Sequence, residues 1–591
     1  MNKNIKILLI LFALAMALYI SGLGATALLD PDEPVYAQTA REMVETGSWL
    51  TPRLNGLLWF DKPPMYFWLS AVSFKIFSTG EFAARFPSSL MASLVIMLVY
   101  IWARRAFNEK IALYSSLSLT FSMLFAFIAR AAVTDMTLCF FMNLSFYSIY
   151  LAWIRPEKRF KYINFFYFFS GFSVLTKGPV GLVLPLIVII TFLFCRRDWK
   201  FLRSLYSPAG FALFALSALP WYIAMLLLHG TQFFNTFIGY HNLIRFLEPE
   251  HVRSSSIFFY FPVLIVGFFP HMAPLGAFIK DFFAKAFTRD FYDRYIFTKV
   301  DILTGKQSFA ASLSFLVFIP AVIFGFFSIA KTKLVTYILP MFPAFSMIIG
   351  YYYHKLSVSG RKNPAGAVLS FLIGGALCWG FYAVAPLKVA VADTAAFFYL
   401  SIAAAVITAL NIFFSLSAGG RLLVYLNCFV MAVFLLTLNL LLLPQLGALH
   451  SSRDICMLIK KEIKPGEKLG CFSKTMSALF YSDVAITHVN ESASSRMGAG
   501  KILGSQPVAG AKNYSADAGK KDDFVRNIKP LNIENAHKYL DKFRKLRDFM
   551  SHKEKVYVIM LDSDFQKYSQ EIKINYKLGA SAGIYTYITN K

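Results

Sequence analysis

Apolar segments of nearly bilayer length recur along this 591-residue chain up to residue 446. A helix needs about 20 predominantly apolar residues to cross the hydrocarbon core of a membrane, so the pattern predicts about 13 transmembrane helices. We expect a polytopic α-helical membrane protein. The expected spans are 6–28, 83–103, 111–130, 134–154, 160–176, 179–195, 208–228, 256–276, 308–330, 334–353, 364–386, 395–416 and 422–446.

The composition supports this class. Hydrophobic residues make up 57% of the chain and charged residues 16%, whereas soluble domains are about half apolar and a quarter charged. Intrinsic disorder and a coiled coil are excluded for the bulk of the chain, and six cysteines are too few for a disulfide scaffold. The first apolar run is too long for a typical signal-peptide core, so we interpret it as an anchor.

The net charge of +26 suggests nucleic-acid binding at first sight, but the positions of the basic residues argue against it. With the N-terminus in the cytoplasm, the basic loops all fall on the cytoplasmic side, as the positive-inside rule requires. These loops are 104–110, 155–161, 196–203, 280–306 and 355–362. We therefore expect no nucleic-acid partner. The same arrangement places four main segments outside: 29–82, 229–255, 331–333 and the chain after 446.

The composition becomes polar, with mixed charge, after residue 446. We divide the chain into a membrane part, residues 1–446, which contains the first outside loop at 29–82, and a C-terminal domain, residues 447–591. Short apolar runs in this domain predict a small soluble α/β fold. The expected strands are 468–473, 485–489 and 555–561, the expected helices 476–481 and 535–547, and the expected long loop 491–529.

Two cysteines, Cys456 and Cys471, lie in this domain. They could pair if the domain faces an oxidising compartment. The alternative is two buried thiols.

The first outside loop carries Asp30, Asp32 and Glu33 directly after a span. Carboxylates at a membrane surface usually serve a cation, a metal or a catalytic reaction. The stretch 35–44 that follows has one apolar face and predicts an interfacial helix. A structural interpretation is equally open, because Asp32 could cap that helix with Glu33 in its first turn.

Three basic groups on the outer side are candidates for phosphate binding. Lys62 lies between Asp61 and two prolines, which restrict its backbone. Lys331, Lys333 and Tyr337 enter a span from outside, where the positive-inside rule disfavours lysine. The alternatives are an Asp61–Lys62 surface pair and lysines whose stems lie along the apolar surface.

The loop at 229–255 adds Arg245, which could bind a phosphate in bidentate fashion. His241 or His251 with Asp61 could hold a divalent metal, although no tight ligand spacing supports a metal site. Two charged residues, Asp135 and Lys177, lie at the outer ends of spans, where they serve function or pair with each other. No phosphate-binding glycine loop or dinucleotide motif is present.

Together these residues resemble the bacterial polyprenyl-phosphate-dependent glycosyltransferases, the family of protein O-mannosyltransferases and lipid A aminoarabinose transferases within the C-type superfamily. The resemblance covers most of residues 1–446. It rests on the following motifs: Asp32-Glu33-Pro-x-Tyr36-Ala, Arg41-Glu42-Met, Thr51 to Gly56, Phe60-Asp61-Lys62-Pro-Pro, Leu175-Thr-Lys177-Gly-Pro and Ala330-Lys-x-Lys333-Leu-x-x-Tyr337-Ile-Leu-Pro.

The resemblance implies an inverting glycosyltransferase of the bacterial inner membrane, with its active site and its C-terminal domain in the periplasm. Asp32, with Glu33 beside it, would act near the reacting centre. The residues that would bind or surround the donor phosphate are Lys62, Arg245, Lys331, Lys333 and Tyr337, and the further site candidates are Tyr36, Arg41, Asp61, Asp135 and Lys177.

The implied partners are the bilayer, a polyprenyl-phosphate-linked sugar donor and a lipid or glycan acceptor, most simply lipid A. No cofactor is required, and a divalent metal is left as an option. Transfer to Ser or Thr hydroxyls of proteins, or the transport of lipid-linked anions, are the alternative functions. Three positions depart from the family pattern, which weakens a metal site and leaves the sugar open: Asp61 for Glu, Val335 for Pro and Tyr240 for an acid.

Overall fold

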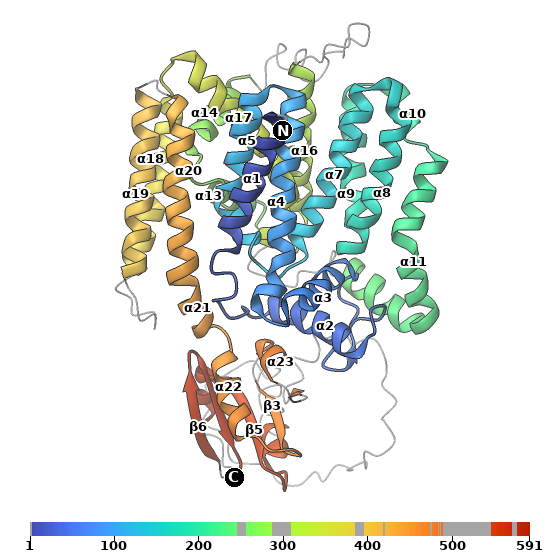
Figure 1. Cartoon of the computed structure of the whole chain (residues 1–591), viewed down its shortest axis with the longest axis vertical. Coiled ribbons are helices and arrows are strands. Elements are labelled where there is room, and N and C mark those ends of the chain that lie inside the picture. Colours follow the sequence, from blue (N-terminus) through green and yellow to red (C-terminus); the bar gives the residue numbers. More distant parts are fainter. Residues whose placement is uncertain are drawn as a thin grey trace, which may run out of the picture.

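A bundle of long helices forms the main body of the protein, and a small sheet domain extends from one end of it (Figure 1). The computed structural model describes residues 3–244, 256–285, 309–384, 395–417, 420–472, 475–482, 484, 486–488, 545–569 and 576–591. The helices of the bundle are α1 (Lys3–Ile20), α4 (Glu81–Ala106), α5 (Glu109–Thr120), α6 (Met123–Ile128), α7 (Asp135–Ile154), α8 (Arg159–Lys177), α9 (Val180–Cys195), α11 (Pro208–Phe233), α13 (Tyr260–Gly267), α14 (Met272–Lys285), α16 (Phe309–Ile329), α17 (Phe342–Ser359), α18 (Pro364–Val384), α19 (Ala395–Leu416) and α20 (Gly420–Thr437).

Among the residues that the structure describes, nine helical stretches are long and apolar enough to cross a membrane. The chain is therefore a multi-pass membrane protein, as predicted. The expected count of about 13 spans is not confirmed by this criterion. One reason is that some expected spans form shorter helices, such as α9 with 16 residues.

Two expected spans are interrupted near the middle of the bundle. The span expected at 111–130 divides into α5 and α6, and the one at 256–276 divides into α13 and α14. Pro270 explains the second break, because proline has no N–H and disfavours a helical conformation before it. The breaks contact each other, since the Met123 N–H donates to the Phe269 carbonyl at 3.0 Å. This bond satisfies backbone groups that lipid could not.

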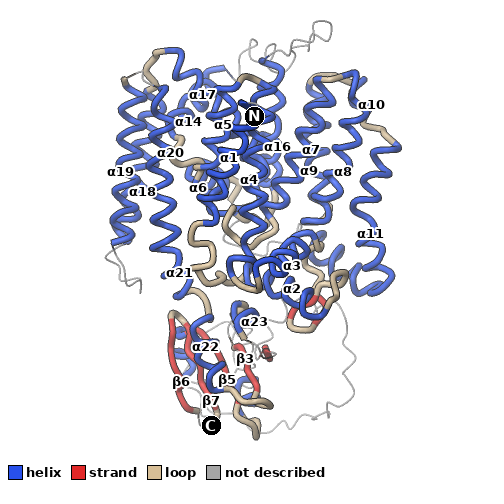
Figure 2. The backbone as a smooth tube through the Cα atoms, viewed as in Figure 1, coloured by secondary structure: helices blue, strands red, loops and turns tan. Residues whose placement is uncertain are grey.

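The segment predicted to form the first outside loop folds into two helices that lie across the end of the bundle (Figure 2). They are α2 (Asp32–Thr46) and α3 (Met65–Phe77), and the hairpin of β1 (Arg53–Leu54) and β2 (Leu57–Leu58) joins them. Asn55 and Gly56, both with positive φ, form the two-residue turn that such hairpins favour.

The C-terminal domain contains a five-stranded sheet with the order β4-β3-β5-β7-β6. Strand β3 pairs in parallel with β4 and β5, whereas β7 runs antiparallel to β5 and β6. The elements are α22 (Arg453–Glu462), β3 (Lys468–Cys471), α23 (Ser477–Tyr481), β4 (Ile486–His488), β5 (Val556–Leu561), α26 (Asp562–Ser569), β6 (Lys577–Ala582) and β7 (Tyr585–Thr589). Before it, η7 (Leu438–Leu442) and α21 (Leu443–Leu449) continue α20.

The predicted α/β fold is thus present, with β3, β4 and β5 at the three expected strands and α23 at the first expected helix. Strands β6 and β7 were not predicted. The expected loop at 491–529 lies outside the described residues, as does most of the expected helix at 535–547, of which 545–547 are helical. Cys456 and Cys471 are both free, buried thiols in this structure.

Candidate functional site

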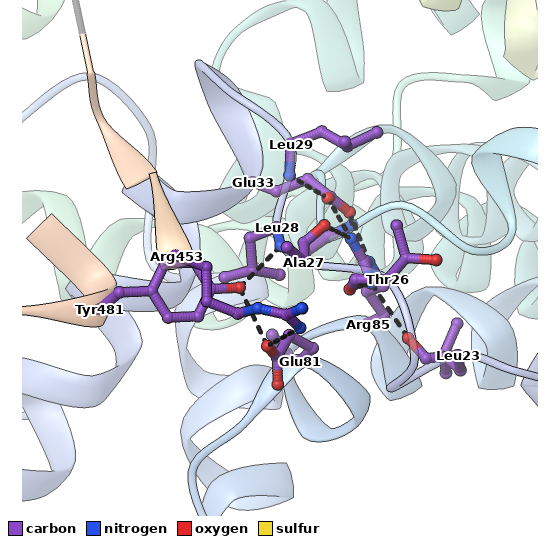
Figure 3. Close-up of polar contacts among 12 residues, drawn as sticks. Leu23, Thr26, Ala27, Leu28, Leu29, Glu33, Glu81, Arg85, Arg453 and Tyr481 are labelled. Atoms are coloured by element: carbon purple, nitrogen blue, oxygen red, sulfur yellow. Dashed lines mark hydrogen bonds and ion pairs between the residues drawn. The ribbon is translucent and has the colours of Figure 1, made fainter. Parts of the chain in front are cut away.

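The two acidic residues at the start of α2 occupy different environments. Helix α2 begins at Asp32 and Glu33, where negative charge is favourable at a helix N-terminus. Asp32 is exposed and lines a cavity of about 670 Å³. Glu33 is buried, with 6% of its surface exposed, and points toward Arg85 of α4 (Figure 3).

The Glu33 carboxylate accepts four hydrogen bonds. Arg85 contacts it twice, through Nε at 2.8 Å and Nη2 at 2.6 Å. The backbone N–H groups of Leu29 and Ala132 donate to it as well, at 2.9 and 2.7 Å. Burial by itself would raise the pKa of Glu33, but the charge and hydrogen bonds of Arg85 hold that pKa below its ordinary value.

Arg85 in turn fixes the backbone that precedes α2. Its guanidinium donates to the carbonyls of Leu23, Thr26 and Ala27 at 2.6 to 3.0 Å (Figure 3). Arg85 was not among the site residues predicted from the sequence, although a charged residue in the first turns of an apolar span is the signal that could have identified it. Both carboxylates line the cavity, but Glu33 is committed to this buried pair, whereas the Asp32 side chain is exposed.

The cavity is amphipathic. Its polar side includes Asp30, Asp32, Arg85 and Arg130. Its apolar walls come from several bundle helices and include Phe127, Val263, Val266, Phe434, Leu435 and Leu438. A cavity of this kind fits a molecule that carries both a polar head and a hydrocarbon chain.

Three predicted site residues from distant parts of the chain meet in one cluster. Lys177, at the end of α8, forms an ion pair with Asp135, at the start of α7, with 2.6 Å between Nζ and Oδ1. The Lys177 ammonium also lies 5.0 Å from the centre of the Tyr337 ring, in the 3₁₀ helix η5 (Val335–Met341). Val335 and Thr336 of η5 line the cavity, so this cluster adjoins it.

The two predicted phosphate-binding lysines before η5, Lys331 and Lys333, differ in exposure. Lys333 is buried, with 3% of its surface exposed, and its Nζ donates to the Ala330 carbonyl at 2.5 Å. Lys331 is exposed. A buried ammonium beside the cavity-lining residues of η5 is suited to an anionic ligand.

Asp61 and Lys62 form an ion pair of 2.9 Å just before α3, and both side chains are largely buried. The residues that flank this pair, Phe60 and Met65, share an apolar cluster with Leu175. The structure therefore brings Lys62 toward the end of α8, which carries Lys177.

Two predicted candidates have structural surroundings instead. Tyr36 is buried against the rings of Tyr66 and Phe67. Arg41 pairs with Glu45 at 2.6 Å and donates to the carbonyl of Phe480 in the C-terminal domain at 3.0 Å.

The proposed metal ligands cannot be placed together. Arg245 and His251 lie outside the described residues, and so does the side chain of His241. Within the described part of the chain, no group of three His, Cys, Asp or Glu side chains could hold a metal ion.

Comparison with known proteins gives a consistent picture. Residues 61–223 match the family described as dolichyl-phosphate-mannose-protein mannosyltransferase. An uncharacterized protein of Aquifex aeolicus is 30% identical over 375 residues, which cover 63% of this chain and 79% of that protein. An undecaprenyl phosphate-α-4-amino-4-deoxy-L-arabinose arabinosyl transferase of Proteus mirabilis is 27% identical over 351 residues, and the match covers 59% of each chain.

Among solved structures, the crystal structure of ArnT from Cupriavidus metallidurans bound to undecaprenyl phosphate matches with a TM-score of 0.74 and 21% identity. This match covers 99% of this chain and 98% of that one. This structural match also covers the C-terminal domain, which lies outside the family match at residues 61–223.

Proposed function

This chain belongs to the bacterial polyprenyl-phosphate-dependent glycosyltransferase family, and on that premise we propose that it moves a sugar from a polyprenyl-phosphate donor to an envelope lipid or glycan. Lipid A is the acceptor that we favour, with an aminoarabinose-type sugar. One observation carries the proposal: Asp32 is exposed in an amphipathic cavity whose apolar walls are bundle helices.

The chemistry follows from this placement. In an inverting displacement, the acceptor attacks the anomeric carbon on the side opposite the leaving lipid phosphate. If the acceptor is a hydroxyl, Asp32 removes its proton as a general base. If the acceptor is already an anion such as a phosphate, no strong base is needed, and Asp32 orients the reacting groups.

The leaving phosphate gains negative charge and needs cations near it. We assign this role to Lys62, Lys333 and Arg245, with Lys331 and Tyr337 beside them. The Asp135–Lys177 pair holds a further ammonium against Tyr337, next to the cavity. We propose no required cofactor for this reaction.

The proposed setting is the bacterial inner membrane, with α2, α3 and the C-terminal domain in the periplasm. The positive-inside distribution of the loops supports this orientation. The arrangement of the fold is compatible with it, because α2, α3 and the sheet lie at one end of the bundle, opposite the start of α1 (Figure 1).

An Asp32→Asn variant tests the function. We expect sugar transfer to fall by about 10²- to 10⁴-fold, the usual contribution of a general base. Mass spectrometry of cells that carry the variant should show lipid A without the sugar and an accumulated lipid-linked donor. The matched control is Glu45→Gln at the far end of α2, an exposed carboxylate that should leave transfer intact.

Each other outcome has a clear meaning. Unchanged lipid A in both variants, with donor accumulating only in Asp32→Asn, would move the acceptor to another glycan or to protein. No change in lipid A or donor, with the variant present at the normal level, would contradict the proposal and favour a transporter of lipid-linked anions.

A further inference from the structure

The C-terminal domain holds the chain immediately before α2 through one carboxylate. Asp30 lies two residues before Asp32, and its Oδ1 accepts the Ser477 backbone N–H at 2.5 Å. Its Oδ2 accepts the Ser477 hydroxyl at 2.7 Å and the Tyr585 hydroxyl at 2.9 Å. These partners lie 447 and 555 residues away along the chain, at the start of α23 and of β7.

The partners of Asp30 are themselves rigid parts of that domain. Ser477 is fully buried, and its Oγ also accepts the backbone N–H of Ser452 at 2.9 Å. Tyr585 is 3% exposed. Burial raises the pKa of Asp30 to about 6, which the hydrogen bonds from Ser477 and Tyr585 partly oppose. Above that value the carboxylate is ionised and accepts all three bonds.

A second set of contacts ties the same segment to the same domain. The Tyr481 hydroxyl accepts the Leu28 backbone N–H at 2.8 Å and donates to Glu81 at 3.0 Å (Figure 3). Arg453 approaches the same Glu81 carboxylate at 3.6 Å. The chain from Leu28 to Asp30 is thus bonded to the C-terminal domain at both ends.

The membrane part holds the neighbouring backbone through Arg85 and Glu33, as described above. The segment that leads into Asp32 is therefore clamped between the membrane bundle and the C-terminal domain. Displacement of a catalytic group by about 1 Å can reduce a rate about 10²-fold, so a clamp at this point affects the reaction.

We propose that the C-terminal domain sets the position of Asp32 and that Asp30 is the positioning residue through which it does so. The inference rests on the proposed function of Asp32. It gives the domain a part in catalysis, as a fixed support of the active-site loop.

The test compares two tyrosines of β7 in the full-length purified chain. Tyr585→Phe removes the hydroxyl that donates a hydrogen bond to Asp30. Tyr587→Phe, the matched control, removes a hydroxyl two residues along whose partner is Glu462 in the same domain, at 3.1 Å. Asp30→Asn and a Ser477→Ala/Tyr585→Phe double variant test the contact from each side.

Two measurements are made on each variant. Hydrogen–deuterium exchange follows the peptide 27–33, and steady-state kinetics follow sugar transfer from a polyprenyl-phosphate donor. We expect faster exchange and a kcat about tenfold lower for Tyr585→Phe, with the donor KM within about twofold of the wild type. The double variant should lose about 10²-fold in kcat, and Tyr587→Phe should match the wild type.

The proposal is overturned if the double variant retains the wild-type kcat and exchange, or if Tyr587→Phe has the same effect as Tyr585→Phe. If the double variant loses its fold in general, hydrogen exchange will also be faster in α4. In that case the exchange and kcat of Asp30→Asn test the proposal. If the wild type transfers no sugar, the proposed function fails. Hydrogen exchange in peptide 27–33 still tests whether the C-terminal domain holds this segment. Unchanged exchange in the double variant would show that it does not.

Discussion

Two adjacent carboxylates show how the surroundings of a residue decide its role. The family resemblance placed Asp32 near the reacting centre, with Glu33 beside it. In the structure, both residues line the cavity, but the Glu33 carboxylate is enclosed by Arg85 and two backbone N–H groups, whereas Asp32 is exposed. A buried ion pair mainly commits its members to structure, since an unpaired partner would be left charged in an apolar region.

This difference predicts a loss of stability for Glu33→Gln. Leaving Arg85 unpaired should cost about 3–5 kcal/mol. Glu109→Gln, which breaks a solvent-exposed pair with Lys3, should change the stability far less, because solvent screens that pair. Thermal unfolding of the full chain in detergent measures both.

The Glu33–Arg85 pair also makes the stability of the fold depend on pH in a known direction. The pKa of Glu33 is lower in the folded chain than in the unfolded chain. Ionised Glu33 therefore stabilises the fold fully above its unfolded-state pKa, and this stabilisation is lost as the pH falls through its folded-state pKa. A Glu33→Gln variant that is as stable as the wild type but inactive would contradict this assignment and make Glu33 catalytic.

At the scale of the elements, the bundle depends on close approaches between helices. A Cβ added at Gly350 of α17 would lie 2.2 Å from the Ser115 hydroxyl and 2.6 Å from the Ser115 backbone nitrogen of α5. Small residues permit such contacts between membrane helices, where burial of apolar surface gives little driving force. Hydropathy identifies the two helices, but it does not show that they touch.

Gly350→Ala should therefore destabilise the protein, by about 1–3 kcal/mol for overpacking against backbone. Gly325 of α16 is the matched control, because an added Cβ meets no atom within 4 Å there. Gly325→Ala should be neutral or stabilising by up to about 1 kcal/mol, since alanine is the better helix former. Thermal unfolding midpoints of both variants, measured in the same detergent, test this prediction. Equal shifts of the two midpoints would show that close packing at Gly350 is not the cause.

At the scale of the whole molecule, the fold places the acidic loop, η5 and the C-terminal domain around one end of the bundle. Helices α2 and α3 lie between the bundle and the sheet (Figure 1). The polar contacts of Asp30, Arg41 and Tyr481 join these layers. The acidic loop thus has protein on both sides.

The proposed orientation makes a prediction at this scale. Alkaline phosphatase, which is active only outside the cytoplasm, should be active when fused after Lys591. The same enzyme inserted in the basic loop at 196–203 should be inactive. The reverse pattern would contradict the proposed placement of the active site.

Much of the architecture could be predicted from the sequence alone. Runs of apolar residues predicted where most helices of the bundle lie, because the bilayer demands a fixed length of apolar helix. Two of the predicted spans, however, are each divided into two helices. Local patterns also predicted α2 and three of the five strands. The family motifs pointed to the residues around the candidate site, including the Asp135, Lys177 and Tyr337 that the structure brings together.

Only the tertiary structure decided which of the two carboxylates stays exposed, which backbone groups bond to each other at the breaks of two spans, and what holds Asp30. Each of these depends on partners far away in the chain: Arg85 for Glu33, Phe269 for Met123, and Ser477 and Tyr585 for Asp30. Hydropathy and motif spacing are local properties of the chain. Burial, ion pairing and hydrogen bonding are set by residues that meet only when the chain has folded.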